Sequence, residues 1–451
     1  FCPSPHMMTV KDIAYRINAG GFKMVITDRD NMAKVDEVAA ECPHLQLRMV
    51  VDDNPLERLS SPWIGYQHEL KYPAPVSTKL VATAGRKVLA TDPMLIYFSS
   101  GTTKDPKMVL HDYGHPLGQT VTAKFWHDLT DKDVHFTVSD TGWAKCGWGK
   151  IYGQWICGAC IFVYDYRTKF LATELLPLIE KYGITSFCAP PTIYRMLIIA
   201  DLKKFSFSEL RTCTSAGEPL NPEVIRIWKE GTGITIREGY GQTETCCCLA
   251  TMPGMEVRQG SMGKPVPGWH IQLHDDDGNE VPQGEIGRIA ISLNPRPAGL
   301  IREYLDNPEE NAAMFVNGWY YTGDKARMDE DGYFWFVGRN DDVIKSSGYR
   351  ISPFEVESAL LEHPAVKESA VVGSPDDLRG MIIKAFIVLH EGYQPSERLG
   401  KEIQNHVKST TAPYKYPRAI EFVTELPKSF SGKIKRGELR DRELKKYEEN
   451  N

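Results

Sequence analysis

The sequence predicts an α/β protein with a large N-terminal domain of α/β layers, a β-rich part that ends this domain, and a small α+β C-terminal domain. Three observations predict this arrangement. Short apolar runs alternate with helical patterns in the first half of the chain. From residue 260 the turns become dense and the strands between them short. A charged, glycine-containing segment at 338–350 then separates two ordered patterns, in a chain of 451 residues that is long enough for two or three domains.

The first half contains apolar runs of strand length and stretches of helical spacing. We expect a helix at 10–19 before a strand at 23–27, further strands at 95–98 and 184–188, and a helix at 174–182. Gly183 ends that last helix just before the strand, because glycine readily takes the conformation that closes a helix. This alternation is typical of α/β folding.

Turn signals define the part between about residues 260 and 340. They lie at 275–278, 317–318 and 331–332, and the strands between them are short and alternating, as at 270–273 and 287–291. We therefore expect a β-rich subdomain that closes the large domain of residues 1–340.

A separate domain is expected at 341–451, and its first helix has clear start chemistry. Ser352 can cap the helix, Pro353 occupies the first helical position, and Glu355 completes a capping box. Strands at 369–372 and 382–389 and a helix at 402–408 follow.

Composition is that of a soluble globular protein, with 42% hydrophobic and 25% charged residues. A net charge of -6 gives no reason to expect nucleic acid as a partner. No run of eighteen apolar residues is present, so we expect no membrane span. The sequence favours small-molecule substrates as partners and leaves the oligomeric state open.

The N-terminus carries no visible targeting signal. Residues 1–6 have neither a charged stretch nor an apolar core, which predicts a cytoplasmic protein. The chain starts with Phe1 and looks truncated, so a transit peptide to the mitochondrial matrix could have preceded it.

Ten cysteines with irregular spacing indicate reduced, cytosolic-type usage. Cys157 and Cys160 form a CxxC, but its apolar neighbours predict a buried segment in preference to a redox or metal site. Three consecutive cysteines at 246–248 could not all bind one metal without backbone strain, so we expect them to pack as small residues.

A hydroxyl-rich loop follows the predicted strand at 95–98. Residues 99–107 read SSGTTKDPK, and their hydroxyls, exposed N–H groups and lysines can surround phosphate oxygens. The loop is not a Walker A motif, because the spacing is absent and the residues at 107–111 alternate as in a strand. The alternative interpretation is a solvated hairpin loop.

Three further segments accompany this loop in a fixed order: SAGEPL at 215–220, EGYGQTET at 238–245, and YTGD at 321–324 with Gly338-Arg339. Alone, each would pass for a polar turn. Together with PKSFSGKI at 427–434 they resemble the motifs of the adenylate-forming superfamily, and most closely those of AMP-dependent acyl-CoA synthetases of the medium-chain subgroup. Lys104 departs from the family pattern, which usually has glycine there. By this resemblance, we expect the chain to start partway into the family's large domain.

The resemblance implies a site for ATP and Mg²⁺. Thr243 would contact the α-phosphate and the acyl carboxylate, and Glu244 would hold Mg²⁺, which prefers one or two carboxylates together with phosphates. Tyr240 would stack on adenine, and Asp324 and Arg339 would bind the ribose. The implied ATP contacts are Ser99, Ser100, Gly101, Thr102, Thr103, Lys104, Asp105, Pro106, Lys107, Gly217, Glu218, Pro219, Glu238, Gly239, Tyr240, Gly241, Gln242, Thr243, Asp324, Arg339 and Lys433.

By the same resemblance, the C-terminal domain is a mobile lid. Lys433 matches the lysine that would bridge carboxylate and α-phosphate during adenylation, although a basic stretch is otherwise usually a solvated tail. Asp341 matches the hinge. After rotation of the lid, the contacts to coenzyme A would come from Ser347, Gly348, Tyr349, Arg350, Arg379, Lys408 and Tyr416.

The expected acid is a medium-chain fatty or related acid, with branched and aromatic acids open. Gly241 leaves room where acetate-specific relatives carry a bulky aromatic residue, and Trp143 would line the acyl pocket. Trp148, Tyr152 and Trp155 are equally good as pocket walls or as ordinary core.

The resemblance therefore implies an ATP-dependent acid–thiol ligase that forms acyl-AMP and then acyl-CoA. No Ser-His-Asp or Cys-His constellation with a motif context competes with it. Two alternatives stay open: an adenylation domain that loads aryl or amino acids onto a carrier protein, with Asp140 as the nearest candidate for an amine-binding carboxylate, or a truncated fragment that only binds nucleotide.

Overall fold

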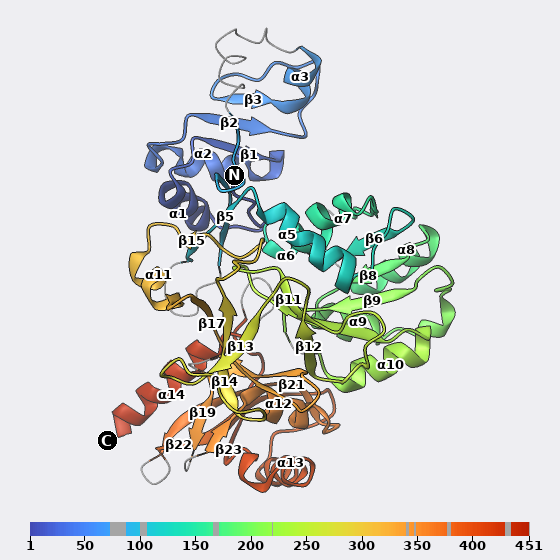
Figure 1. Cartoon of the computed structure of the whole chain (residues 1–451), viewed down its shortest axis with the longest axis vertical. Coiled ribbons are helices and arrows are strands. Elements are labelled where there is room, and N and C mark those ends of the chain that lie inside the picture. The colour runs from blue at the N-terminus through green and yellow to red at the C-terminus, as the bar shows by residue number, and fades with distance from the viewer. Residues whose placement is uncertain are drawn as a thin grey trace.

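Figure 1 shows a computed structural model of the chain, which describes residues 1–72, 87–99, 106–165, 171–218, 220–339, 342–346, 349–376, 380–428 and 434–450. The N-terminal elements and the C-terminal elements lie at opposite ends of the long axis. A large sheet with its helices lies between them.

A small parallel sheet forms the N-terminal end. Its strands are β1 (Met24–Thr27), β2 (Leu47–Val50) and β3 (Trp63–Gly65), in that order. The helices of this part are α1 (Val10–Gly20), α2 (Arg29–Val38) and α3 (Tyr66–Lys71), with a 3-10 turn at Ala39–Glu41. Helix α1 has a capping box between Thr9 and Asp12 and ends at Gly21, whose φ of 58° favours glycine. The expected helix and strand at 10–27 are confirmed.

A three-stranded antiparallel sheet carries the hydroxyl-rich loop. It consists of β4 (Pro93–Phe98), β5 (Met108–Asp112) and β15 (Glu303–Tyr304), with β5 in the middle. The backbone N–H of Ser99 donates to the Lys107 carbonyl at 2.9 Å, so the two ends of the loop meet. The expectation of strands on both sides of the loop is confirmed.

Among the described residues, the central sheet has twelve strands and combines parallel with antiparallel pairing. A parallel part contains β7 (Cys160–Ile161), β6 (Val134–Thr137), β8 (Ser186–Cys188), β9 (Thr212–Ser215) and β10 (Ile236–Gly241). An antiparallel part continues it through β11 (Cys247–Ala250), β12 (Ser261–Pro265), β18 (Phe334–Arg339), β17 (Trp319–Met328), β14 (Ile286–Ser292) and β13 (Ile271–His274), with β16 (Phe315–Val316) beside β17. The β-rich part expected from the turns is therefore present, but it is continuous with the parallel sheet.

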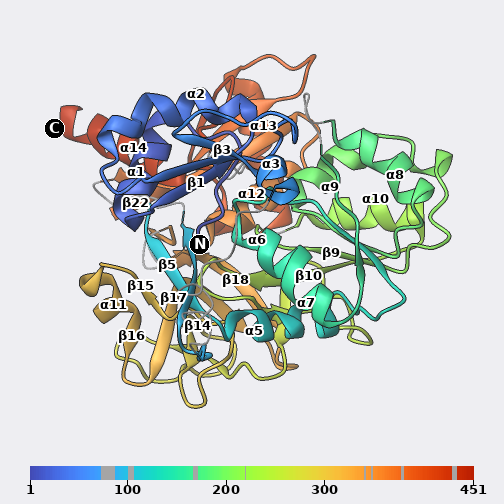
Figure 2. The same cartoon turned by 90° about the horizontal axis from the view of Figure 1, so that it is seen from above.

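Helices cover both faces of the parallel strands. On one face lie α8 (Leu175–Lys181), α9 (Pro191–Leu197) and α10 (Pro222–Thr232), which appear on the right in Figures 1 and 2. They pack on Phe136, Phe187 and Ile236, and Trp228 of α10 lies fully buried among them. The remaining helical segments of the large domain are α5 (His115–Val121), α6 (Ala144–Cys146), α7 (Tyr152–Ile156), α11 (Pro308–Met314), π-helical turns at Thr122–Trp126 and Gly147–Ile151, and 3-10 turns at Ala172–Glu174 and Leu202–Lys204. Nothing in the sequence pattern predicted the π-helical turns.

The C-terminal elements form their own core. A hairpin of β19 (Ile344–Ser346) and β20 (Tyr349–Ile351) precedes α12 (Pro353–Leu361), a sheet in the order β21-β22-β23 (Val366–Asp376, Gly380–Leu389, Ala419–Phe422), α13 (Glu397–Thr410), a 3-10 turn at Pro413–Lys415, and α14 (Arg436–Asn450). Ser352 caps α12 as expected, since its hydroxyl accepts the backbone N–H of Glu355. The Glu355 carboxylate binds Lys415, and only the Ser352 half of the expected capping box is present. Among the described residues, no helix is both long enough and apolar enough to cross a membrane.

Two expectations about cysteines have different outcomes. Cys246, Cys247 and Cys248 are fully buried in the core, which confirms their role in packing. The segment around Cys157 and Cys160 is not buried: Cys160 is exposed, and Trp155 keeps 66% of its surface. The prediction of burial was wrong although the neighbouring residues are apolar, because α7 is short and exposes one side to solvent.

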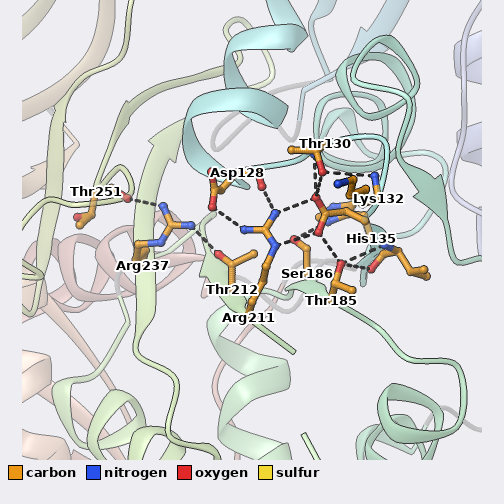
Figure 3. A network of polar contacts seen from close by, with 12 residues as sticks. Asp128, Thr130, Lys132, His135, Thr185, Ser186, Arg211, Thr212, Arg237 and Thr251 are labelled. Atoms are coloured by element: carbon orange, nitrogen blue, oxygen red, sulfur yellow. Dashed lines mark hydrogen bonds and ion pairs between the residues drawn. The ribbon is translucent and has the colours of Figure 1, made fainter. Parts of the chain in front are cut away.

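A charged network fastens the amino ends of the parallel strands (Figure 3). Arg211, just before β9, donates to both carboxylate oxygens of Asp133, just before β6, at 2.9 and 2.8 Å. Thr185, just before β8, donates to the same carboxylate at 2.7 Å. Although burial acts in the opposite direction, these donors and Thr130 hold the pKa of Asp133 down to about 2. One buried carboxylate therefore ties three strand starts together.

We predict that Asp133→Asn lowers the free energy of unfolding by about 2 kcal/mol at neutral pH, because charge-assisted hydrogen bonds to a buried group are lost. Urea unfolding would measure the change. Since the folded-state pKa lies below the unfolded one, the wild-type advantage is present above about pH 4. It should fade as the pH falls towards 2.

The matched control is Glu223→Gln in the exposed Glu223–Arg226–Glu230 cluster of α10. Surface ion pairs contribute little, so no resolvable change is expected there. Equal effects of both substitutions would contradict the role of Asp133.

Candidate functional site

The carboxyl edge of the parallel strands brings two predicted motifs together. Strand β9 ends at Ser215, which begins the turn at 215–220, and β10 carries the motif at 238–245. The two strands are parallel neighbours, with Glu238 opposite Ser215. Ligands of open α/β sheets bind at this edge of the sheet. Residues that lie over twenty positions apart in the sequence therefore lie side by side.

Glu238 fastens the first turn to the sheet. Its two carboxylate oxygens accept the backbone N–H groups of Leu220 and Gly260, each at 3.0 Å. Burial raises the pKa of Glu238 to about 7, and the two N–H donors oppose that rise. The buried side chain thus holds the turn at 215–220 against the sheet, a structural role that the motif did not predict.

The first turn itself has a conformation that requires glycine. Gly217 has a φ of 110°, which L side chains rarely adopt, and an added Cβ would meet no atom within 4 Å. Glu218 accepts hydrogen bonds from Thr192 and Arg195, at 2.8 and 3.0 Å. Lys145 donates to the Ala216 carbonyl at 3.0 Å. Pro219 lies outside the described residues.

Asp324 is the centre of a second cluster. Its Oδ2 accepts the Tyr240 hydroxyl at 2.6 Å and the Gln242 amide at 2.7 Å. Strand pairing places Asp324 opposite Arg339, and the binding of one ribose by both residues stays a prediction. The side chain of Asp324 is buried and already oriented, whereas that of Arg339 is exposed.

Thr243 and Glu244 lie in the turn between β10 and β11, and two distant segments hold them. The buried His111 of β5 contacts the Thr243 carbonyl through Nε2 at 2.9 Å. Burial lowers the pKa of His111 to about 4, so the ring is neutral and Nε2 carries the donated proton. Tyr304 donates to Glu244 Oε1 at 3.0 Å, and the Ile301 N–H donates to the Glu244 carbonyl at 2.6 Å.

The surroundings of Glu244 fit the predicted magnesium ligand. Burial raises the pKa of this carboxyl, although the side chain keeps some surface open. Across the described part of the chain, no three His, Cys, Asp or Glu side chains gather into a protein-only metal site. A single carboxylate beside a predicted phosphate loop suits Mg²⁺, which takes most of its other ligands from phosphates and water.

Two glycines permit this turn. A Cβ on Gly239 would lie 2.7 Å from Cys247 Sγ and from the Trp126 ring, and one on Gly241 would lie 2.1 Å from the Cys246 carbonyl oxygen. Gly241 is therefore required by the backbone itself, apart from any room for an acyl chain. Its place in an acyl pocket stays a prediction, as does that of the half-buried Trp143.

The aromatic residues that the sequence offered as pocket walls or core differ in their burial. Trp148 is 4% exposed and packs in the core with Trp126, while Tyr152 is partly buried beside it. Trp155 is 66% exposed, so the alternative that it belongs to the core is wrong, and a place in a pocket wall stays a prediction. Asp140 accepts the Gly142 N–H at 2.7 Å and is a turn residue.

Several predicted residues lie outside the described part of the chain, or are described by backbone alone. Outside are Ser100, Gly101, Thr102, Thr103, Lys104, Asp105, Asp341, Ser347, Gly348, Arg379 and Lys433. Tyr349 and Arg350 are placed only as strand β20. Of the loop, Ser99, Pro106 and Lys107 are described, and Lys107 binds Glu310 at 2.5 Å.

Two of the predicted coenzyme A contacts come together. The ammonium of Lys408 lies 4.0 Å from the centre of the Tyr416 ring. Arg418, which the sequence reading missed, lies 5.0 Å from the same ring and donates to the Tyr416 hydroxyl at 2.7 Å. These three side chains therefore form a cationic, aromatic surface on the C-terminal domain.

Comparison with known proteins agrees with this geometry. Residues 2–305 match the family model for AMP-binding enzymes, and residues 355–433 match that for the AMP-binding enzyme C-terminal domain. The mitochondrial acyl-coenzyme A synthetase ACSM3 of Rattus norvegicus is 48% identical over 445 residues, covering 98% of this chain and 75% of that protein.

Solved structures give the same picture. The anthranilate CoA ligase AuaEII in complex with anthranoyl-AMP superposes with a TM-score of 0.85 at 32% identity, covering 97% of this chain and 81% of that one. The Brucella canis acyl-CoA synthetase gives a TM-score of 0.68 at 35% identity, covering 99% and 80%.

The fold and the matches define an adenylate-forming enzyme. The chain belongs to the AMP-binding enzyme family. The predicted class, an AMP-forming acid–thiol ligase of the acyl-CoA synthetase type, is confirmed by these similarities, as is the predicted α/β fold.

We predict that the free energy of unfolding falls as the pH rises from about 4.5 to about 7, by something on the order of 3 kcal/mol from Glu238 alone. The sign follows because the folded-state pKa is raised, so the folded protein binds more protons in that window. Glu238→Gln should remove this slope in urea unfolding measured across pH.

The control is Glu285→Gln on an exposed turn, which should keep the slope. A slope that survives unchanged in Glu238→Gln would contradict the assignment to that carboxyl.

Proposed function

We propose that this acyl-CoA synthetase activates a medium-chain or related carboxylic acid at the carboxyl edge of its central sheet. The observation that carries the proposal is the convergence at that edge of the turn at 215–220, the turn at 238–245 and Asp324. Those segments are the ones that the family resemblance assigns to adenine, phosphate and ribose.

In the first half-reaction, an oxygen of the substrate carboxylate attacks the α-phosphorus of ATP. The bond to the β-phosphate oxygen breaks, and pyrophosphate leaves with that electron pair. Asp324, held by Tyr240 and Gln242, accepts from the ribose hydroxyls. Phosphoryl chemistry of this kind depends on positioning and electrostatics. Lys433 would supply a positive charge at the α-phosphate, where negative charge builds up during the attack.

Glu244 would hold Mg²⁺, which when bound neutralises charge on the phosphates. The Ser99–Lys107 loop would bind the β- and γ-phosphates with hydroxyls, N–H groups and lysines. The contact between Ser99 and Lys107 holds both ends of this loop at one place, beside β5.

In the second half-reaction, the sulfur of the coenzyme A thiol attacks the acyl carbonyl carbon, and the thiol proton passes to solvent. The bond from that carbon to the phosphate oxygen breaks, and AMP leaves with the electron pair. We propose that the domain after Asp341 rotates to bring its other face to the site. Lys408, Tyr416 and Arg418 form a surface there that suits phosphates and an adenine ring.

The substrate is proposed to be an apolar acid. Buried methylenes each contribute about 0.8 kcal/mol, so the pocket would rank chain lengths gradually. Loading of amino acids onto a carrier protein is less favoured, because the carboxylate of Asp140 is already used in its own turn. We place the protein in mitochondria, instead of the cytoplasm first expected, because relatives such as rat ACSM3 are named mitochondrial.

Lys433→Ala should lower ATP–pyrophosphate exchange by about 100-fold or more, since one positioned cation at the reacting phosphate is removed. The assay uses a panel of acids from acetate to decanoate together with benzoate. A nucleotide-binding fragment without activity would show no exchange with any acid.

Lys428→Ala is the matched control, because Lys428 lies in the same basic stretch but pairs with Glu368 at 2.7 Å. It should retain exchange. Undiminished exchange in Lys433→Ala would refute the role of that lysine, and failure to saturate with free coenzyme A would favour a carrier-protein acceptor.

A further inference from the structure

A tyrosine hydroxyl reaches the proposed magnesium ligand from a segment sixty residues away. The Tyr304 hydroxyl donates to Glu244 Oε1 at 3.0 Å, and it lies 3.2 Å from the Tyr320 hydroxyl. Tyr304 and Tyr320 are 4% and 0% exposed. No motif named above contains Tyr304.

Strand β15 and the residues just before it make two hydrogen bonds to Glu244. Ile301, two residues before the strand, donates its N–H to the Glu244 carbonyl, while Tyr304 binds the carboxylate. Main chain and side chain of Glu244 are thus both held by residues 301–304. A tyrosine hydroxyl keeps its proton at neutral pH, and the ionised carboxylate can only accept, so Tyr304 is the donor.

Tyr304 is itself fixed on both sides. Strand β15 pairs with β5, with Tyr304 opposite Val109. The Asn311 side chain accepts the Tyr304 N–H at 2.8 Å and donates to the Tyr304 carbonyl at 2.7 Å. A hydroxyl on so constrained a backbone can select one orientation of its partner.

The same ring faces the exit of the phosphate loop. The Lys107 ammonium lies 5.6 Å from the centre of the Tyr304 ring and binds Glu310 at the start of α11. Tyr304 therefore contacts both the last lysine of the loop and the carboxylate of Glu244, to which the proposed function assigns the phosphates and Mg²⁺.

We propose that Tyr304 is a positioning residue for the metal–phosphate end of the site: its hydroxyl holds Oε1 of Glu244 so that the other carboxylate oxygen is presented to Mg²⁺. This rests on the proposed function, since Glu244 as a magnesium ligand is part of it. Groups that orient a metal ligand commonly change metal affinity 10–100-fold when removed.

The test is Tyr304→Phe, which keeps the ring and removes only the hydroxyl. The free Mg²⁺ concentration for half-maximal ATP–pyrophosphate exchange should rise about tenfold. At saturating Mg²⁺, the KM for ATP should change by less than about threefold. Binding of Mn²⁺ with ATP, followed by electron paramagnetic resonance, should weaken by a similar factor without any turnover.

Two tyrosines serve as matched controls. Tyr333→Phe removes a distant hydroxyl that donates to the Glu256 carbonyl and should leave the Mg²⁺ dependence unchanged. Tyr320→Phe removes the hydroxyl that touches Tyr304 but not Glu244, and should produce a smaller shift than Tyr304→Phe.

A folded Tyr304→Phe protein with wild-type Mg²⁺ dependence and Mn²⁺ affinity would overturn the inference. Glu244→Gln separates this failure from that of the proposed function. If Glu244→Gln shifts the Mg²⁺ dependence and Tyr304→Phe does not, only the inference fails. If neither shifts it, the role of Glu244 fails as well.

Should Tyr304→Phe not fold, Asn311→Ala takes its place, because it releases the Tyr304 backbone and leaves the ring intact. A rise of about threefold in the half-saturating Mg²⁺ concentration is expected, and no rise would overturn the inference.

Discussion

The reversal of the chain between β10 and β11 is the constraint on which the site depends. Within a few residues the backbone leaves a parallel strand and returns as an antiparallel one. A Cβ on Gly241 would come within 2.1 Å of the Cys246 carbonyl oxygen, so this close approach excludes every other residue type. The turn places Thr243 and Glu244 at the carboxyl edge of the sheet and lets the β-rich part join it without a break.

The two edges of the parallel sheet are organised differently. At the amino edge, Asp133 receives donors from the starts of two other strands and has little left to offer a ligand. At the carboxyl edge, Glu238 holds the turn at 215–220 through a hydrogen bond, and two donors orient the side chain of Asp324. The contacts that tie strand starts together thus lie at the amino edge, and the predicted site lies at the carboxyl edge, where ligands of open α/β sheets bind.

Buried neutral groups hold both Thr243 and Glu244 in the turn between β10 and β11. His111 is uncharged because burial lowers its pKa, and it fixes the main chain of Thr243 through a single hydrogen bond. The Tyr304 hydroxyl donates to the carboxylate of Glu244. Such contacts add no charge to the turn, but they restrict where the main chain of Thr243 and the carboxylate of Glu244 can lie. Reactions that rely on electrostatic positioning benefit from this restriction.

The sequence by itself determined the order of the motifs, the fold class and most elements, because residue spacing along one strand or helix is local chemistry. The helix at 10–19, the strands around the hydroxyl-rich loop and the Ser352 cap all follow from neighbours in the chain. Tertiary structure alone decided that Tyr304 meets Glu244, that Arg418 joins Tyr416 and Lys408, and that Trp155 faces solvent. Contacts between elements depend on how sheets and helices pack. The presence of an apolar or aromatic residue does not by itself predict which side of a short helix is buried.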